Sequence, residues 1–244
     1  MALRLFDKWQ DQSLDGIIAE CRELVDDADF PTVKRWREAG GKVLGHFQVY
    51  FPEEIAHAAG MLPLKMRGAP VECMHSDSHF GSYLCSIIKT SLELTLGKRV
   101  ELDMFVTHPI FDAARNLGAV WGRNFNYPCQ ILYLPQNANS AASATYLRDE
   151  YARVQADIEA ITGKKVTEEA LRNSLAVFNE NRSLLRRLYE IKRKQPWQLS
   201  VFEAYLLMNV GGMIQREEHN EMLKAAIPLI AARPAKRQDK IRVV

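Results

Sequence analysis

Between residues 40 and 140, short apolar runs alternate with amphipathic segments, and few folds satisfy such an alternation. The helical patterns between the runs are short and carry helix-start and helix-end residues. Strands and helices that alternate at this spacing predict an α/β fold with an open, mostly parallel, flavodoxin-like sheet, followed here by a helical block. The runs suited to buried strands are KVLGHFQVY, LPLKM, LDMFVTHP and CQILYLPQN, and the helical segments are FPEEIAHAAG, HFGSYLCSIIKTSLELTLGK and IFDAARNLGAVWGRNF.

The segment 79–98 is predicted as one continuous helix that ends at Gly97. Its apolar residues recur at helical spacing, which indicates one buried face. The side chains predicted to face inward include Tyr83, Leu84, Ile87, Ile88, Ser91, and Leu92 or Leu94.

Changes in composition and hydrophobic periodicity divide the chain into four segments. Residues 1–39 are predicted as N-terminal helices, 40–140 as the α/β domain and 141–232 as a helical domain reached through the linker NANSAASAT. The last segment, 233–244, contains the strand-like run KIRVV. It predicts a linker and the first strand of a further α/β domain that this chain lacks; the alternative is a strand that pairs back onto the first sheet.

Charge and cysteine usage exclude several classes of protein. A formal net charge of +2 over 244 residues provides no strong field for nucleic acid or an anionic membrane. The sequence has no run of about 18 apolar residues that could span a membrane, and MALRLFDKWQ lacks the apolar centre of a signal peptide. Four cysteines without a CxxC pair predict free thiols in a reducing, cytoplasmic compartment.

Ligands of open α/β sheets bind beyond the carboxyl ends of the strands. The loops predicted there begin near 48–52, 67–80, 107–110 and 135–139. No glycine-rich phosphate loop, GxSxG elbow or HExxH motif is present. Glu53 and Glu54 follow Pro52, and they indicate either a helix start or a catalytic carboxylate.

Cys85 lies where a polar loop becomes a helical pattern. Three interpretations stay open: a buried apolar residue, a thiol activated by the positive end of a helix, or one ligand of a metal cluster. His75 and His79 are four residues apart, as in a helical metal pair, but the SDS between them favours a loop or helix cap.

The segments GKVLGHFQVYFPEEIAHAAGMLPLKMRG, HSDSHFGSYLCSIIKTSLEL, THPIFDAARNLGAVWGRNF and ILYLPQN occur in an order and spacing that resemble one family. The resemblance is to the benzoyl-CoA reductase and 2-hydroxyacyl-CoA dehydratase family, over about residues 40–232. It implies two related subunits, each with a [4Fe–4S] cluster near an acyl-CoA thioester, and an ATP-dependent iron–sulfur activator that supplies electrons. The chemistry implied is a low-potential, one-electron reduction that side chains cannot perform without such a cofactor.

The resemblance also assigns roles to residues. Cys85, in a CS-x-x-K segment, matches one of three cysteine ligands of the cluster. A second ligand belongs in a CDAARN-like segment, where this sequence has Phe111, and the third belongs in the C-terminal domain. Gln48 and Tyr50 are implied as substrate-binding residues and Glu54 as a catalytic residue, although Tyr50 also fits a packed aromatic.

These observations predict a subunit of an iron–sulfur-dependent acyl-CoA reductase or dehydratase. Because Phe111 cannot bind iron, the alternative is a cluster-free scaffold or binding subunit that supports a catalytic partner. A flavin-binding protein of flavodoxin type is a third interpretation, and the absence of a clear phosphate cradle disfavours it.

Overall fold

The structure is a computed structural model that describes residues 9, 12–47 and 50–234. The chain divides into two compact units. We name residues 28–174 the sheet unit, and residues 1–27 together with 175–244 the helical unit. The domain boundaries predicted from the sequence, after residues 39, 140 and 232, stay a prediction. The strand predicted in KIRVV lies outside the described residues.

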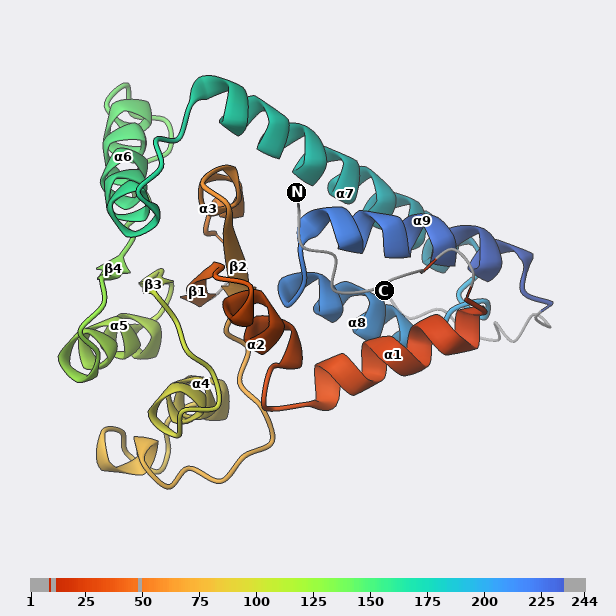
Figure 1. Ribbon diagram of the computed structural model, residues 1–244, viewed down its shortest axis with the longest axis horizontal. Helices are drawn as coiled ribbons and strands as arrows, with labels where there is room; N and C mark the ends of the chain where they lie inside the picture. The colour runs from red at the N-terminus through yellow and green to blue at the C-terminus, as the bar shows by residue number, and fades with distance from the viewer. Residues whose placement is uncertain (1–8, 10–11, 48–49, 235–244) are drawn as a thin grey trace. The chain divides into compact units, whose positions relative to one another are not determined.

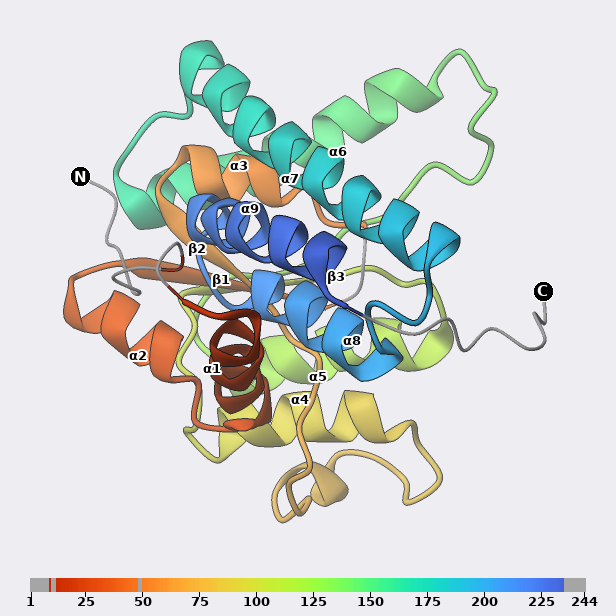
Figure 2. The same cartoon turned by 90° about the vertical axis from the view of Figure 1, so that its right-hand side faces the viewer.

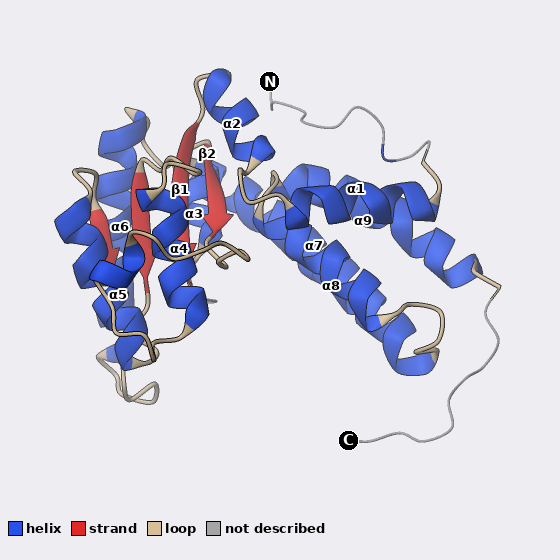
Figure 3. Ribbon diagram, turned by 90° about the horizontal axis from the view of Figure 1, so that it is seen from below, coloured by secondary structure: helices blue, strands red, loops and turns tan. Residues whose placement is uncertain are grey.

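The sheet unit contains a parallel sheet with the strand order β2-β1-β3-β4 (Figure 3). Leu44 of β1 lies opposite Pro63 of β2 and Met104 of β3. This order and direction confirm the predicted α/β fold with an open parallel sheet. The described strands are β1 (Lys42–Phe47), β2 (Met61–Lys65), β3 (Met104–Thr107) and β4 (Cys129–Ile131).

Helices cover both faces of this sheet, which explains why its strands are apolar on both sides. In Figures 1 and 2, α3 (Glu53–Ala58) and α6 (Ser143–Thr162) lie on one face, and α4 (Ser86–Leu96) and α5 (Asp112–Asn124) lie on the other. Each fully buried aliphatic side chain contributes about 1.5–3 kcal/mol to folding. The buried core on the α3 and α6 face consists of Leu44, Phe51, Ile55, Ala56, Ala59, Met61, Met104, Val106, Leu132, Val154, Ile158 and Val166.

The opposite face is held by an aromatic stack. The rings of Phe105 and Trp121 are parallel, with centroids 3.7 Å apart. Gly118 allows α5 to approach the sheet closely, because a Cβ at this position would lie 2.6 Å from Cγ2 of Thr107. The strands and α5 therefore pack with little tolerance for added volume.

The helix predicted over 79–98 is shorter than expected, because α4 begins at Ser86. The preceding residues form a loop that contains η2 (Ser76–Ser78). The Glu93 carboxylate accepts hydrogen bonds from the backbone N–H groups of His75 and Ser76, which ties this loop to α4. The prediction that Tyr83 and Ile87 face inward is therefore wrong: Tyr83 is 92% exposed and Ile87 is 44% exposed.

The helical pattern over 13–39 is divided in two. α1 (Leu14–Asp26) and α2 (Pro31–Glu38) are separated at Phe30, whose φ is +48°. A left-handed residue followed by proline cannot continue a helix. The apolar face of α1 is buried at Ile17 and Cys21, which are 0% exposed.

The described part of the helical unit is all helical. Its later helices are α8 (Val201–Asn209), η3 (Val210–Gly212) and α9 (Arg216–Ala232), and α1 packs against α8 and α9 (Figure 2). α7 (Glu168–Lys194) connects the two units along the sequence. Thr167 caps the start of α7, because its Oγ1 accepts a hydrogen bond from the N–H of Ala170.

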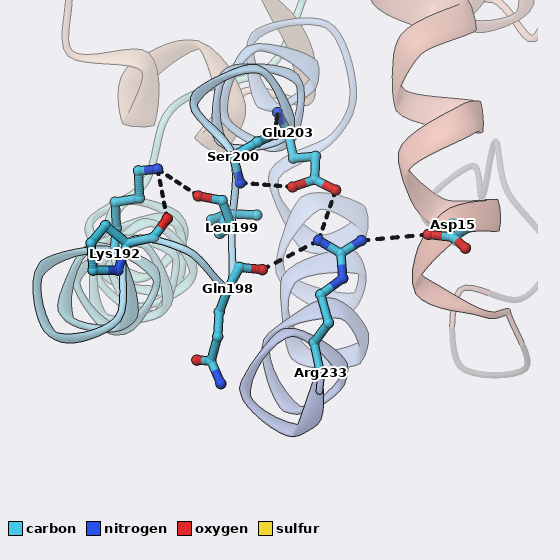
Figure 4. Close-up of polar contacts among 8 residues, drawn as sticks. Asp15, Lys192, Gln198, Leu199, Ser200, Glu203 and Arg233 are labelled. Carbon is cyan, nitrogen blue, oxygen red and sulfur yellow. Dashed lines mark hydrogen bonds and ion pairs between the residues drawn. The ribbon is translucent and has the colours of Figure 1, made fainter. Parts of the chain in front are cut away.

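Arg233 fastens the end of α9 to the start of α8 (Figure 4). Its guanidinium donates hydrogen bonds to the Gln198 carbonyl oxygen at 3.2 Å and to the Glu203 carboxylate at 2.9 Å. Glu203 also forms a capping box with Ser200 at the start of α8. The cluster in Figure 4 thus satisfies backbone groups at helix ends, which is a structural role.

Candidate functional site

The strand order places the candidate site at the carboxyl ends of β1 and β3. In an open α/β sheet, ligands bind where the chain order reverses, and in the order β2-β1-β3-β4 this point lies between β1 and β3. Tyr50 follows β1, and His108 follows β3 directly. The two loops therefore meet at the position where this fold class carries its ligand.

The side chains of Tyr50 and His108 are in contact. Their ring centroids are 5.9 Å apart, and the rings are nearly perpendicular. Tyr50 is 52% exposed, whereas His108 is 1% exposed. The prediction of a packed aromatic is therefore only half right, since one side of the Tyr50 ring packs on His108 and the rest faces solvent.

His108 is buried without a hydrogen bond to either ring nitrogen. The backbone carbonyl groups of Tyr50 and Leu132 lie near the ring, but neither forms a hydrogen bond of good geometry with it. Burial lowers the pKa of His108 and outweighs the nearby carbonyl groups of Tyr50 and Leu132, which act in the opposite direction, while the neighbouring His46 adds to the lowering. The imidazole is therefore neutral at neutral pH, with one N–H donor and one acceptor nitrogen.

Glu54 lies in the first turn of α3 and is 8% exposed. Burial, and then the charge of Glu54, raise the pKa of Tyr151 on α6. The Glu54 carbonyl oxygen accepts a hydrogen bond of 2.9 Å from the Ser174 hydroxyl, which fixes the backbone of α3. A buried carboxylate at this edge of the sheet is a candidate for proton transfer.

An acid–histidine pair lies next to Glu54. His46 Nε2 on β1 is 3.2 Å from the Glu53 carboxylate, and Lys65 Nζ on β2 is 4.0 Å from the same oxygen. The His46 ring also contacts Phe51, with centroids 5.2 Å apart. The carboxyl edge of β1 is therefore rich in titratable groups, whereas the sequence pattern pointed to Gln48, Tyr50, Glu53 and Glu54 but not to His46 or Lys65.

Cys85 is exposed and is the N-cap residue of α4. The interpretation of Cys85 as a buried core residue is therefore wrong, and its predicted place at the start of a helix is confirmed. Phe111 occupies the equivalent N-cap position of α5 and is 40% exposed. Both residues begin helices that follow strands, so they lie toward the same carboxyl edge of the sheet.

The other cysteines do not join Cys85 in a cluster. Burial raises the pKa of Cys21 to about 12 and that of Cys129 to about 11. Cys129 opens β4, at the amino end of that strand, and Cys73 lies in the loop before η2. Within the described ranges, no group of three or more His, Cys, Asp or Glu residues is arranged to hold a metal ion. These residues alone therefore do not fit a four-iron cluster, which needs about four ligands.

His75 and His79 lie at the two ends of η2. The Nδ1 atom of His75 is 2.7 Å from the Glu93 carboxylate, which favours the loop interpretation of this pair. Gln48 lies outside the described residues. Sequence reasoning did not select His108 or Tyr151; the only signal was that His108 belongs to a loop at a strand's carboxyl end.

Comparison with known proteins decides the family. Residues 48–244 match the family described as 2-hydroxyglutaryl-CoA dehydratase, D-component. The chain belongs to this family. The resemblance in the sequence motifs is thus confirmed.

The chain is similar to subunits of several acyl-CoA reductases and dehydratases. The chain is 36% identical to the C subunit of benzoyl-CoA reductase from Thauera aromatica, over 95% of its own length and 62% of that protein. It is 28% identical to lactoyl-CoA dehydratase subunit beta of Anaerotignum propionicum, over 85% of this chain and 55% of the relative. It is 25% identical to (R)-2-hydroxyglutaryl-CoA dehydratase subunit beta of Acidaminococcus fermentans, over 86% and 56% respectively. The chain thus spans little more than half the length of these dehydratase relatives, and 62% of the reductase relative.

Proposed function

We propose that this chain is part of a subunit of an acyl-CoA reductase or 2-hydroxyacyl-CoA dehydratase. The observation that carries the proposal is the similarity to the C subunit of benzoyl-CoA reductase, which extends over 95% of the chain. These relatives are all named after acyl-CoA thioesters, so the proposed substrate class is an acyl-CoA.

The acyl-CoA site is proposed at the β1 and β3 edge. Its buried carboxylate, Glu54, and its half-exposed Tyr50 support this location. Glu54 is the proposed catalytic residue, because a desolvated carboxylate can exchange a proton with a bound substrate. Tyr50 is a proposed substrate-binding residue, and so is Gln48, which lies outside the described residues.

A homologous subunit is the proposed partner, since the relatives are named as subunits. Exposed apolar side chains that follow three of the strands support a covering partner at this edge. These side chains are Tyr50, Ile110, Phe111, Tyr133 and Leu134. An ATP-dependent iron–sulfur activator remains part of the proposal through the family resemblance alone.

The iron–sulfur chemistry is also a proposal. A [4Fe–4S] cluster would supply the low-potential, one-electron reduction of the thioester, and Cys85 would be its thiolate ligand from the sheet unit. The described residues do not complete the ligand set, so the other ligands would have to come from elsewhere in the assembly. A reducing, cytoplasmic location is proposed in keeping with four free cysteines. None of the helices in the described ranges has the length and apolar character needed to cross a membrane.

A cluster-free scaffold is the second candidate, and Phe111 favours it. The phenyl ring stands where the resemblance expects a cysteine, at the N-cap of α5. In this case the subunit would bind the acyl-CoA or its catalytic partner without iron.

One experiment separates the two candidates. The full-length protein is purified anaerobically with its partner, and iron per chain is measured for wild type, Cys85→Ser and Phe111→Cys, with Phe111→Ser as the matched control. A cluster-bearing protein predicts iron in wild type that Cys85→Ser removes. Iron that is absent from wild type and from Phe111→Cys would favour the scaffold. Failure of the wild-type complex to bind benzoyl-CoA or lactoyl-CoA would overturn the acyl-CoA assignment itself.

A further inference from the structure

His108 is the most unusual polar residue of the sheet unit. It is 1% exposed, and neither ring nitrogen makes a hydrogen bond of good geometry, although the backbone carbonyl groups of Tyr50 and Leu132 lie near the ring. Most buried polar groups are paired, because an unpaired one loses its bonds to water without replacement. His108 lies at the ligand-binding edge of the sheet. Its imidazole is therefore suited to form a hydrogen bond with a bound ligand.

Tyr50 separates His108 from solvent on one side. Its ring lies edge-on against the imidazole, yet half of the Tyr50 side chain is exposed. An exposed aromatic side chain can change rotamer on a fast timescale. Rotation of Tyr50 would open a path to the His108 ring without movement of the sheet.

The surroundings of His108 favour a ligand oxygen that accepts a hydrogen bond. The N-cap of α5 lies three residues later, and no side chain caps the first turn of this helix. The unpaired N–H groups of a helix start carry partial positive charge, which attracts an oxygen with partial negative charge. The neutral imidazole adds an N–H donor at the same edge, and a thioester carbonyl is an acceptor of the required kind.

We propose that His108 binds the carbonyl oxygen of the acyl thioester through a ring N–H, and that the Tyr50 side chain moves aside to admit it. This inference rests on the proposed function, because it assumes an acyl-CoA ligand. His108 is thereby a ligand-binding residue in addition to Tyr50. The neighbouring pair of His46 and Glu53 is already engaged at 3.2 Å.

The test compares two probes that differ at the carbonyl alone. Isothermal titration calorimetry measures the affinity of the full-length complex for benzoyl-CoA and for S-benzyl-CoA, the thioether in which CH₂ replaces the C=O group. Loss of one hydrogen bond is expected to weaken binding of the thioether to wild type about tenfold. In His108→Leu, the affinity for benzoyl-CoA should fall to that for S-benzyl-CoA, whose own affinity should stay unchanged.

Three further variants keep the test decisive. His108→Gln retains an N–H donor and should keep part of the preference for benzoyl-CoA, and His108→Phe provides a second apolar variant should the leucine variant not fold. His57→Leu is the matched control, since His57 is engaged with Ser174 at 2.9 Å and should leave the preference intact.

The outcomes distinguish the two proposals. If wild type binds neither probe, the acyl-CoA assignment is overturned and this inference with it. If wild type binds both probes equally, or if the His108 variants weaken both equally, the role of His108 is overturned while the acyl-CoA assignment stands.

Discussion

The Glu93 carboxylate accepts a 2.8 Å hydrogen bond from the backbone N–H of Ser76, which joins α4 to the loop that precedes it. His75 adds a backbone N–H at 2.9 Å and its Nδ1 at 2.7 Å. One carboxylate thus organises the start of η2, in the loop that leads to the exposed Cys85. This arrangement depends on the charged form of Glu93.

The first prediction concerns pH and stability. Burial opposes ionisation of Glu93, but hydrogen bonds from Ser76 and His75 outweigh it and lower its pKa from 4.5 to about 2. Because the pKa of Glu93 is lower in the folded than in the unfolded protein, the charged carboxylate stabilises the fold at every pH above 4.5. This stabilisation is about 3 kcal/mol at most, and it is lost as the pH falls from 4.5 to about 2. Glu93→Gln should lower the Tm at neutral pH, and it should make the free energy of unfolding less dependent on pH below 4.5. Glu72→Gln, at an exposed position of the same loop, should do neither; an equal pH dependence for wild type and Glu93→Gln would refute the prediction.

The second prediction concerns the stability cost of His108. An unpaired buried polar group costs about 1–3 kcal/mol, so the apolar variant His108→Leu should be more stable than wild type by a similar amount, measured by urea unfolding. His57→Leu should be less stable, because it removes the contact with Ser174. A loss of stability in His108→Leu would indicate that the imidazole is a structural element of the core.

The third prediction uses two glycines of α5. A Cβ at Gly118 would lie 2.6 Å from Thr107 and 2.7 Å from Ile131, so Gly118→Ala should destabilise the protein by about 1–3 kcal/mol. At Gly122 the nearest atom is Cβ of Cys129 at 3.8 Å, and Gly122→Ala should stabilise α5 by up to about 1 kcal/mol. Chemical denaturation should show that the free energy of unfolding falls in Gly118→Ala and rises in Gly122→Ala. A change of the same sign in both variants would contradict the packing described for this face.

The fourth prediction concerns the Arg233 cluster of Figure 4. Arg233→Met removes the bonds to Gln198 and Glu203, and it should lower stability by about 1–2 kcal/mol, since the guanidinium is partly exposed. Arg233→Lys should lose less, because it keeps the charge but not the planar fork. Arg187→Met, at an exposed position of α7, is the control and should leave the Tm unchanged.

The fifth prediction concerns catalysis by the assembled enzyme. Glu54→Gln keeps the shape of the side chain but removes its proton-transfer capacity, so kcat should fall about 100-fold or more with little change in the affinity for the acyl-CoA. Glu169→Gln, at an exposed position in the first turn of α7, should retain full activity. A wild-type kcat in Glu54→Gln would exclude this carboxylate as the acid–base group.

Local sequence patterns were sufficient for the element types and for several helix ends. The apolar runs of β1 and β3 are buried on both faces, and short-range periodicity reports such burial directly. Thr167 and Gly97 mark helix ends because their chemistry acts on the nearest backbone groups. The helix predicted over 79–98 failed before Ser86, where the chain is still in the loop that follows η2. The Glu93 carboxylate fixes the start of this loop through the amides of His75 and Ser76, and periodicity contains no information on such a contact.

The sequence by itself determined the α/β class, the family and the position of Cys85 at a helix start, since each follows from neighbouring residues or from motifs in order. Only the tertiary structure decided that Tyr50 contacts the buried His108, that Glu54 is buried, and that no group of three or more His, Cys, Asp or Glu residues is arranged to hold a metal ion within the described ranges. The physical reason is the strand order β2-β1-β3-β4, which brings together loops that are far apart in the chain. Side-chain contacts between such loops depend on how the sheet is assembled, and local preference does not encode them.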